Sequence, residues 1–340
     1  MFVFLLALCL VSLYKLKIIK WNDSYLGLRE TTALKGFFIG LVFLSHLQTY
    51  LNPSLGGVLD RYALSIINLF GQLMVAYFFF CSGYGVMLSL QTKKDYEKGF
   101  FRHRILKTLV HFDIAILLYL LLSVCIGKQY DLKHYLFCWI GWESIGNSNW
   151  FIFVTLMLYL ITLISFQIKK KLVISPSAMI TVIIVLCIAL WIGLYLTKPS
   201  YWYNTLLCYP AGMCIANRKA WLDCHLKRTG AFWIISCFTL IFFAITYWIP
   251  NQLAYSVSSI AFCCIVMLAS TKIEINSTVL LWMGNYLFEI YILQRIPMIV
   301  CSRVGISNQY LFGISSIIVT MTLAILYKMM EKKVDKLLQL

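Results

Sequence analysis

The chain has 340 residues, of which 61% are hydrophobic and only 12% are charged. Soluble domains carry roughly 25% charged residues, so this balance excludes a soluble globular protein. The apolar runs are long and continuous, which also excludes the short alternating segments of a β-barrel. The composition predicts an all-α fold, a polytopic transmembrane helix bundle.

The formal net charge of +16 is compatible with nucleic-acid binding, but the basic residues cluster between the apolar runs. In those positions they would meet anionic lipid headgroups or a polyanionic small molecule. We therefore expect the lipid bilayer as a partner and no nucleic acid. The twelve cysteines stand in apolar surroundings without a CxxC pair, which indicates small core residues and no metal site.

The first apolar run extends from Met1 to about Tyr14 and is followed by Lys15, Lys17 and Lys20. A secretory signal has its charge before the apolar part, so this order argues against one. The run is either a short spanning helix with its N-terminus outside or a helix lying on the membrane. Residues 1–30 thus form an apolar helix with a basic segment, and residues 31–335 form the main transmembrane domain.

The stretch 33–51 places a cation, Lys35, eleven residues before a histidine, His46. In a helix this spacing spans ~16 Å and returns to nearly the same face. A buried ionisable group in a membrane helix is costly, so His46 is a candidate functional residue; the alternative is a structural hydrogen bond to a neighbouring helix. Gly36 and Gly40 form a GxxxG pair, which predicts close helix packing.

Breaks are expected at Asn52–Pro53 and Gly56–Gly57. Further apolar runs follow, and with 33–51 they make ten predicted core spans, besides the N-terminal helix. They lie at about 64–90, 109–126, 150–166, 178–196, 201–216, 232–249, 254–270, 278–298 and 311–330.

Loop charge predicts the orientation of these spans. The most basic loop is 91–108, and alternation places nearly every other basic cluster, including the C-terminal tail, on the same side. By the positive-inside rule that side is the cytoplasm. Lys35 then lies at the cytoplasmic surface, and His46 lies past the midplane towards the outside.

Other polar residues fall within or at the ends of spans. His111, Asp113 and Glu289 are intramembrane, and the alternative for both carboxylates is a structural hydrogen bond between helices. Arg102, Arg104 and Lys107 stand where the basic loop becomes a helix, so they can converge on a phosphate-rich ligand. P-loop, GxGxxG, HExxH and GxSxG motifs are absent from the sequence.

Five stretches share a further property. They are ALKGFFIGLVFLSH, FFFCSGYGVMLSL with FFRHRILKTL, NSNWFIFVTLMLYL, YNTLLCYPAGMCIANRK and WMGNYLFEIYILQ. In order and spacing they resemble the motifs of the membrane acyltransferase-3 family, beginning with a basic residue, ten residues and a histidine. The resemblance covers about residues 33–330.

The resemblance implies a ten-helix enzyme of the bacterial plasma membrane, and the loop charge described above predicts a cytoplasmic C-terminus for it. Such an enzyme moves an acyl group, usually acetyl, from cytoplasmic acyl-CoA to a hydroxyl of an envelope polysaccharide or a lipid-linked saccharide. His46 matches the essential histidine and would act as general base on the acceptor hydroxyl. The implied donor site comprises Lys35, Ser82, Tyr84, Arg102, Arg104 and Lys107.

Asn149 and Trp150 are candidates for substrate binding. Together with Tyr84 they are also candidates for donating hydrogen bonds to the oxyanion.

Two positions depart from the family pattern. Lys35 replaces an arginine and loses its bidentate geometry. Gln294 stands where the family commonly has histidine, which leaves Glu289 as the second candidate catalytic residue. The alternatives are a transporter or flippase of lipid-linked saccharide, or a catalytically inactive membrane partner.

Overall fold

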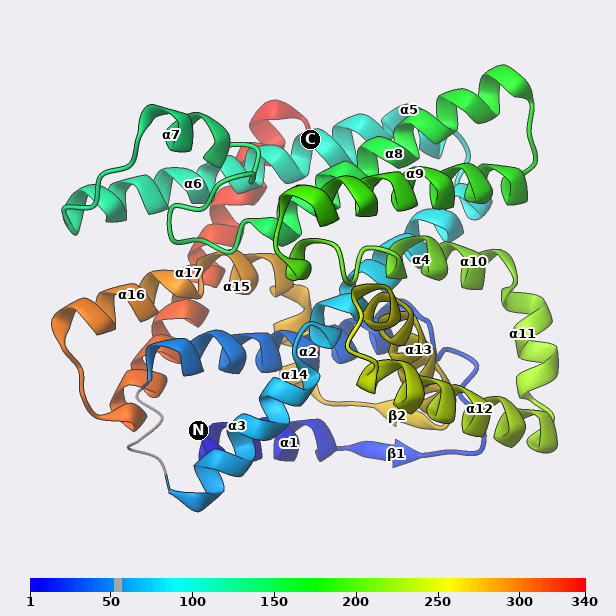
Figure 1. Cartoon of the computed structure of the whole chain (residues 1–340), viewed down its shortest axis with the longest axis horizontal. Coiled ribbons are helices and arrows are strands. Elements are labelled where there is room, and N and C mark those ends of the chain that lie inside the picture. Colours follow the sequence, from blue (N-terminus) through cyan, green and yellow to red (C-terminus); the bar gives the residue numbers. More distant parts are fainter. Residues whose placement is uncertain (52–56) are drawn as a thin grey trace.

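The computed structural model describes residues 1–51 and 57–340, and nearly all of these residues that belong to regular elements are helical (Figure 1). A bilayer offers no hydrogen-bond partners to the backbone, so apolar runs of this length fold as helices. Seven helical segments of the described ranges are long and apolar enough to cross a membrane. They are Val58–Thr92, Tyr96–Cys125, Trp150–Leu172, Pro176–Thr197, Thr229–Trp248, Gln252–Ser270 and Gln309–Leu338. The predicted polytopic helix bundle is confirmed.

Two of these segments contain more than one helical element. The first joins α3 (Val58–Phe70) and α4 (Leu73–Thr92), with Gly71 at a positive φ of 45° between them. The second joins α5 (Tyr96–Phe100), a π-helical stretch η3 (Phe101–Leu106) and α6 (Lys107–Cys125). The expected breaks at Asn52–Pro53 and Gly56 lie outside the described residues.

The remaining long helices follow the predicted runs. They are α2 (Leu28–Leu47), α8 (Trp150–Leu172), α9 (Pro176–Thr197), α12 (Thr229–Trp248), α13 (Gln252–Ser270) and α17 (Gln309–Leu338). Shorter helices are α1 (Phe2–Leu13), α7 (Leu132–Cys138) and α11 (Lys219–Leu226), with 3₁₀ turns at Gln48–Tyr50 (η1) and Ser200–Trp202 (η4).

Two of the predicted spans are short or broken in the structure. In the run 201–216 the only α-helix is the ten-residue α10 (Cys208–Asn217), preceded by the η4 turn. The run 278–298 is divided among α14 (Thr278–Asn285), α15 (Leu287–Leu293) and α16 (Arg295–Val304). A helix of ten residues is ~15 Å long, half the thickness of the hydrocarbon core. These short helices therefore depend on their neighbours within the bundle.

Helix α14 lies against α2 in a close crossing that glycines make possible (Figure 1). A Cβ atom on Gly36 would lie 1.9 Å from the carbonyl oxygen of Leu280, and one on Gly284 would lie 1.9 Å from that of Thr32. On Gly40 a Cβ would meet the side chains of Leu8 and Met283. The close packing predicted from Gly36 and Gly40 is confirmed.

Helices α4 and α10 make a second crossing of the same kind. A Cβ on Gly83 would lie 1.9 Å from the carbonyl oxygen of Tyr209, and one on Gly212 would lie 2.0 Å from that of Phe80. Any larger side chain at these positions would force the helices apart. The two short helices are thus each held against the backbone of a long helix.

Two short strands connect the N-terminal region to a distant part of the chain. Strand β1 (Leu16–Ile18) pairs antiparallel with β2 (Ile273–Ile275), with Leu16 opposite Ile275. Nearby, Asn22 Nδ2 donates to the carbonyl oxygen of Ile273 at 2.8 Å. The backbone between α1 and α2 is therefore fixed to the connection between α13 and α14.

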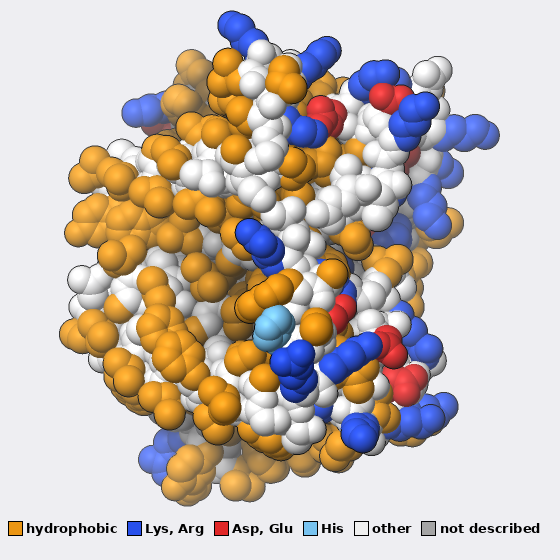
Figure 2. Space-filling model, turned by 90° about the vertical axis from the view of Figure 1, so that its right-hand side faces the viewer, with side chains coloured by type: hydrophobic (Ala, Val, Ile, Leu, Met, Phe, Trp, Pro, Cys, Tyr) orange, Lys and Arg blue, Asp and Glu red, His pale blue; other side chains and the backbone are white. Residues whose placement is uncertain are grey.

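Basic residues gather at one end of the bundle, the right-hand end in Figure 1, where the α8–α9 turn and α11 lie. Lys169, Lys170 and Lys171 occupy the last turn of α8, and Arg218, Lys219 and Lys227 flank or begin α11. Figure 2 looks onto this end and shows many Lys and Arg side chains across it. We call it the basic end.

The first prediction concerns the α2–α14 crossing. Replacing Gly36 with alanine puts a methyl carbon 1.9 Å from the carbonyl oxygen of Leu280, well inside van der Waals contact. Overpacking of this kind costs about 1–3 kcal/mol, so we expect G36A to lower the melting temperature of the purified protein. G193A on α9 is the control, because nothing lies within 4 Å of its added Cβ. Equal melting temperatures for the two variants would contradict the close crossing.

Candidate active site

A cavity of about 500 Å³ lies among α2, α4, η3, α6, α8 and α15. Four residues of the predicted donor site line it, namely Lys35 of α2, Ser82 and Tyr84 of α4, and Arg104 of η3. Much of the remaining lining is apolar and includes Phe78, Phe79, Phe151 and Phe288. The structure therefore combines two separate cations with an apolar interior in one cavity.

Arg104, in the cavity wall, is hydrogen-bonded to a tyrosine. It lies on the π-helical stretch η3, a backbone form that is frequent at functional sites. Its Nε donates to the hydroxyl of Tyr96 at 3.3 Å. Across the cavity wall, Ser82 Oγ and the Tyr159 hydroxyl lie 3.0 Å apart, and Tyr159 packs on Phe100. Tyr159 is a lining residue that the sequence did not single out.

The other two residues of the predicted basic cluster lie elsewhere. Arg102 Nη2 donates to the carbonyl oxygen of Leu338 at 2.9 Å, on the protein surface. Lys107 Nζ lies 2.6 Å from Asp335 Oδ2 of α17. Neither lines the 500 Å³ cavity. Two of the three cations that the sequence grouped together, Arg102 and Lys107, therefore bond to the end of α17.

A second cavity, of about 490 Å³, adjoins the first, with Arg104, Thr108, Leu287 and Phe288 contributing to both. Charged residues of α6, α15 and α17 form ion pairs along it. His111 Nε2 lies 2.8 Å from Asp335 Oδ1, and its Nδ1 lies 3.2 Å from Glu331 Oε1.

Glu289 belongs to this second cavity. It is almost fully buried, and its Oε1 lies 3.0 Å from Lys328 Nζ of α17. No ion pair or hydrogen bond joins it to His46 in the described part of the chain. The structure thus pairs this candidate catalytic carboxylate with a lysine. Asp113, on α6, has a buried Oδ1 without a hydrogen-bond partner among the described residues.

His46 lies one residue before the end of α2 and is partly buried. Its Nδ1 is buried and has no hydrogen-bond partner among residues 1–51 and 57–340. The ring centroid is 6.4 Å from that of Tyr291, which packs on Phe151 at 5.1 Å. Phe151 in turn packs on Phe79 at 4.6 Å, and both line the 500 Å³ cavity. His46 therefore lies behind the aromatic wall of that cavity.

Asn149 and Trp150 stand at the start of α8, where the connection 127–149 joins the bundle. Asn149 Nδ2 donates to the carbonyl oxygen of Gly141 at 2.7 Å, so its amide holds the connection in place. Trp150 packs edge-on against Phe151 and Tyr201, with both centroid distances 5.9 Å.

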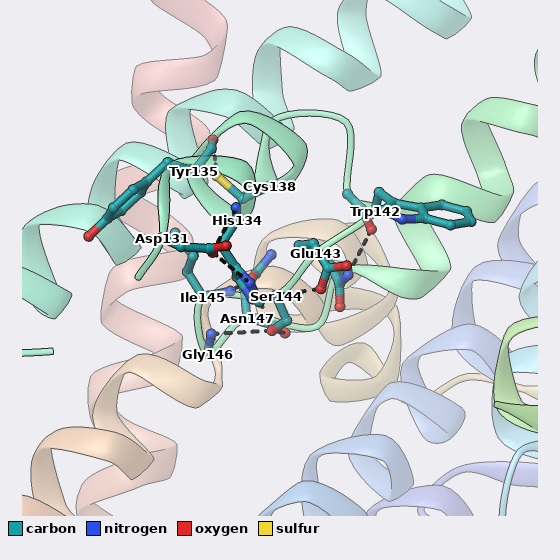
Figure 3. Close-up of polar contacts among 12 residues, drawn as sticks. Asp131, His134, Tyr135, Cys138, Trp142, Glu143, Ser144, Ile145, Gly146 and Asn147 are labelled. Atoms are coloured by element: carbon teal, nitrogen blue, oxygen red, sulfur yellow. Dashed lines mark hydrogen bonds and ion pairs between the residues drawn. The ribbon is translucent and has the colours of Figure 1, made fainter. Parts of the chain in front are cut away.

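The connection before α8 is shaped by its own polar contacts, as Figure 3 shows. Ser144 Oγ donates to the carbonyl oxygen of Asn147 at 2.8 Å and accepts from the backbone N–H of Gly146 at 3.2 Å. Lys198, from beyond α9, donates to the carbonyl oxygen of Trp142 at 2.9 Å and lies over its ring. These contacts fold the connection onto the end of the bundle away from the α8–α9 turn.

Sequence reasoning did not single out Tyr159, Tyr291, Arg295 or Lys328. For Arg295 a signal existed, because an arginine within the predicted span 278–298 is an intramembrane charge. For the tyrosines no signal existed, because tyrosines are numerous in the chain and only the fold shows which ones meet.

The bundle and its cavity define a multi-pass membrane protein with a cation-lined site among its helices. A family model described as an acyltransferase domain, that of the acyltransferase-3 family, matches residues 29–329. The chain therefore belongs to this family and is a membrane acyltransferase, as its motifs predicted. Comparisons with curated proteins and with solved structures gave no match.

The second prediction tests the contact between α17 and α6. D335N removes the carboxylate that faces both Lys107 and His111. Hydrogen bonds to charged groups contribute roughly 1.5–3 kcal/mol each when partly buried, so we expect a clear loss in the free energy of unfolding.

The matched control is D95N, which removes an exposed ion pair with Lys98 that is worth below about 1 kcal/mol. Thermal unfolding of both purified variants measures the difference. If D335N unfolded at the same temperature as D95N, the contact would not stabilise the bundle.

Proposed function

We propose that this membrane acyltransferase moves an acyl group, foremost acetyl, from acyl-CoA to a sugar hydroxyl of an envelope or capsular polysaccharide or of a lipid-linked saccharide. The observation that carries the proposal is the cavity with Lys35 and Arg104 in its lining, and His46 behind its Phe79–Phe151 wall. We assign the basic end to the cytoplasm, on the positive-inside rule, and the membrane to the bacterial cell.

The chemistry of the donor supports this assignment. The nucleotide end of coenzyme A carries several phosphate charges, which the ammonium of Lys35 and the guanidinium of Arg104 would bind. Its pantetheine arm is thin and largely apolar, as is much of the cavity lining. A volume of about 500 Å³ lies within the range of small-molecule sites. The thioester would then approach the Phe151 side, where His46 lies.

His46 supplies the base that a sugar hydroxyl needs. A hydroxyl is a weak nucleophile at neutral pH, and a neutral imidazole can take its proton during attack on the thioester carbonyl. The unpartnered Nδ1 of His46 is free to do so, since none of the described residues bonds to it. Collapse of the tetrahedral intermediate breaks the C–S bond, and the thiolate leaves as CoA with the proton returned from His46.

The third prediction tests His46. H46A removes the proposed base, and general-base catalysis is typically worth about 10²–10⁴ in rate. We expect the variant to insert into the membrane normally and to leave the cell's envelope saccharide without ester-linked acetyl. Mass spectrometry of saccharide from a complemented deletion strain is the measurement.

H225A is the control, since the ring of His225 lies against that of Trp221 on α11, with centroids 4.1 Å apart, at the basic end. Full acetylation by H46A would refute the role of the histidine. An absence of ester-linked acetyl even in the wild type would favour a transporter or an inactive partner.

The fourth prediction distinguishes the contributions of Arg104 and Arg102 to donor binding. R104M removes a charge from the cavity, whereas R102M removes one from the surface. Losing one charge-assisted phosphate contact costs roughly 1.5–3 kcal/mol, so we expect R104M to raise the KM for acetyl-CoA about 10-fold or more. R102M should stay within about twofold. Equal increases in the two variants would place the phosphates outside the cavity.

A further inference from the structure

Among the buried polar atoms without hydrogen-bond partners in the described ranges, four lie at, or next to, the junction between α15 and α16. They are Nδ1 of His46, the hydroxyl of Tyr291, Oε1 of Gln294 and Nε of Arg295. Buried polar groups are nearly always hydrogen-bonded in native proteins, so a cluster of exceptions needs an explanation. Space for water or for a polar part of a ligand at this point would satisfy them.

The spacing of these residues brings three of them to one place. Tyr291 and Arg295 are four residues apart in a helical stretch, so their side chains lie on the same face. The ring of Tyr291 is the neighbour of the His46 ring. The charge of Arg295 is close enough to act on both His46 and Tyr291. A base, a phenol and a guanidinium therefore converge at the outer end of α2.

The helix junction that carries Tyr291 and Arg295 is held from two sides. The hydroxyl of Tyr119, a fully buried residue of α6, donates to the carbonyl oxygen of Ile292 at 2.9 Å. Gln294 turns its amide back to donate to the carbonyl oxygen of Tyr291 at 3.1 Å. Donors that are already oriented stabilise a developing charge without the cost of reorganisation.

We propose that Arg295 and Tyr291 bind the oxyanion that forms when the acceptor hydroxyl attacks the thioester. The inference rests on the proposed function. As the new C–O bond forms, the carbonyl π electrons move onto oxygen, and the hydroxyl proton passes to His46. The Arg295 Nε–H and the Tyr291 O–H donate to that oxygen until the C=O bond re-forms and the thiolate leaves.

The oxyanion donors expected from the sequence fit this role less well. The Asn149 amide is engaged with the carbonyl oxygen of Gly141. Tyr84 lines the cavity with Lys35, and no contact of the described residues joins it to His46. A guanidinium beside the base also supplies a full positive charge, which a neutral amide does not.

The test measures transfer of labelled acetyl from acetyl-CoA by purified enzyme. Membrane vesicles from a strain lacking this chain supply the acceptor. We expect R295Q to lower kcat about 10²–10³-fold and Y291F to lower it about 10-fold or more, with the KM for acetyl-CoA within about twofold. R303Q, which changes an exposed arginine of the same helix α16, should keep wild-type kcat.

Chemical rescue separates catalysis from structure. Added guanidinium should restore part of the kcat of R295A, because a small cation can enter the space that the side chain leaves. An unchanged kcat in R295Q, or a defect confined to the apparent KM for the vesicles, would overturn the proposal; the latter would assign Arg295 to acceptor binding. Should the Arg295 variants fail to fold, wild-type kcat in Y291F would overturn it.

Failure of the oxyanion assignment can also be distinguished from failure of the proposed function. If H46A is inactive while R295Q and Y291F keep full kcat, acyl transfer with His46 as base stands and only the oxyanion assignment falls. If the wild-type enzyme transfers no acetyl to the vesicles, the proposed function itself fails.

Discussion

The backbone contact between α2 and α14, matched by that between α4 and α10, is the constraint on which the site depends. Gly36 follows Lys35 directly, and Gly83 lies between Ser82 and Tyr84. Because each glycine must face its partner helix, the side chains beside it are turned by ~100° to a defined direction. Three residues of the cavity lining, Lys35, Ser82 and Tyr84, are thus oriented by the glycines next to them.

Ion pairing determines which of the cations keep their charge available to a ligand. The chain has 29 Lys and Arg but only 13 Asp and Glu, so few cations can have a carboxylate partner. Lys107 and Lys328 each have one, from Asp335 and Glu289. Arg104 bonds to a tyrosine hydroxyl instead, and a neutral partner leaves its charge available to an anionic ligand.

The sequence was sufficient for the parts of the structure that local properties determine. Apolar length predicted the helix bundle, and the resemblance of the motifs to those of the acyltransferase-3 family grouped Lys35, Ser82 and Arg104, which line one cavity. The sequence was not sufficient where contacts between distant segments determine the structure. The run 278–298 is apolar enough to look like one span, but in the structure it is divided among three helices, of which α14 and α15 pack on α2. Likewise, Lys107 and Arg104 are close in sequence and both line the second cavity, but Lys107 is paired with Asp335 of α17 and only Arg104 also lines the first cavity.

The pairing of the N-terminal region with β2 has a consequence for the order in which the protein is made. Asn22 and Ile273, which bond to each other, are 251 residues apart. At 5–20 residues per second, synthesis takes roughly 13–50 s to cover that distance. Over this interval α2, with its lysine and histidine, has been made but α14 has not. The helix that carries Lys35 and His46 is therefore among the first to be made and among the last to gain its packing partner.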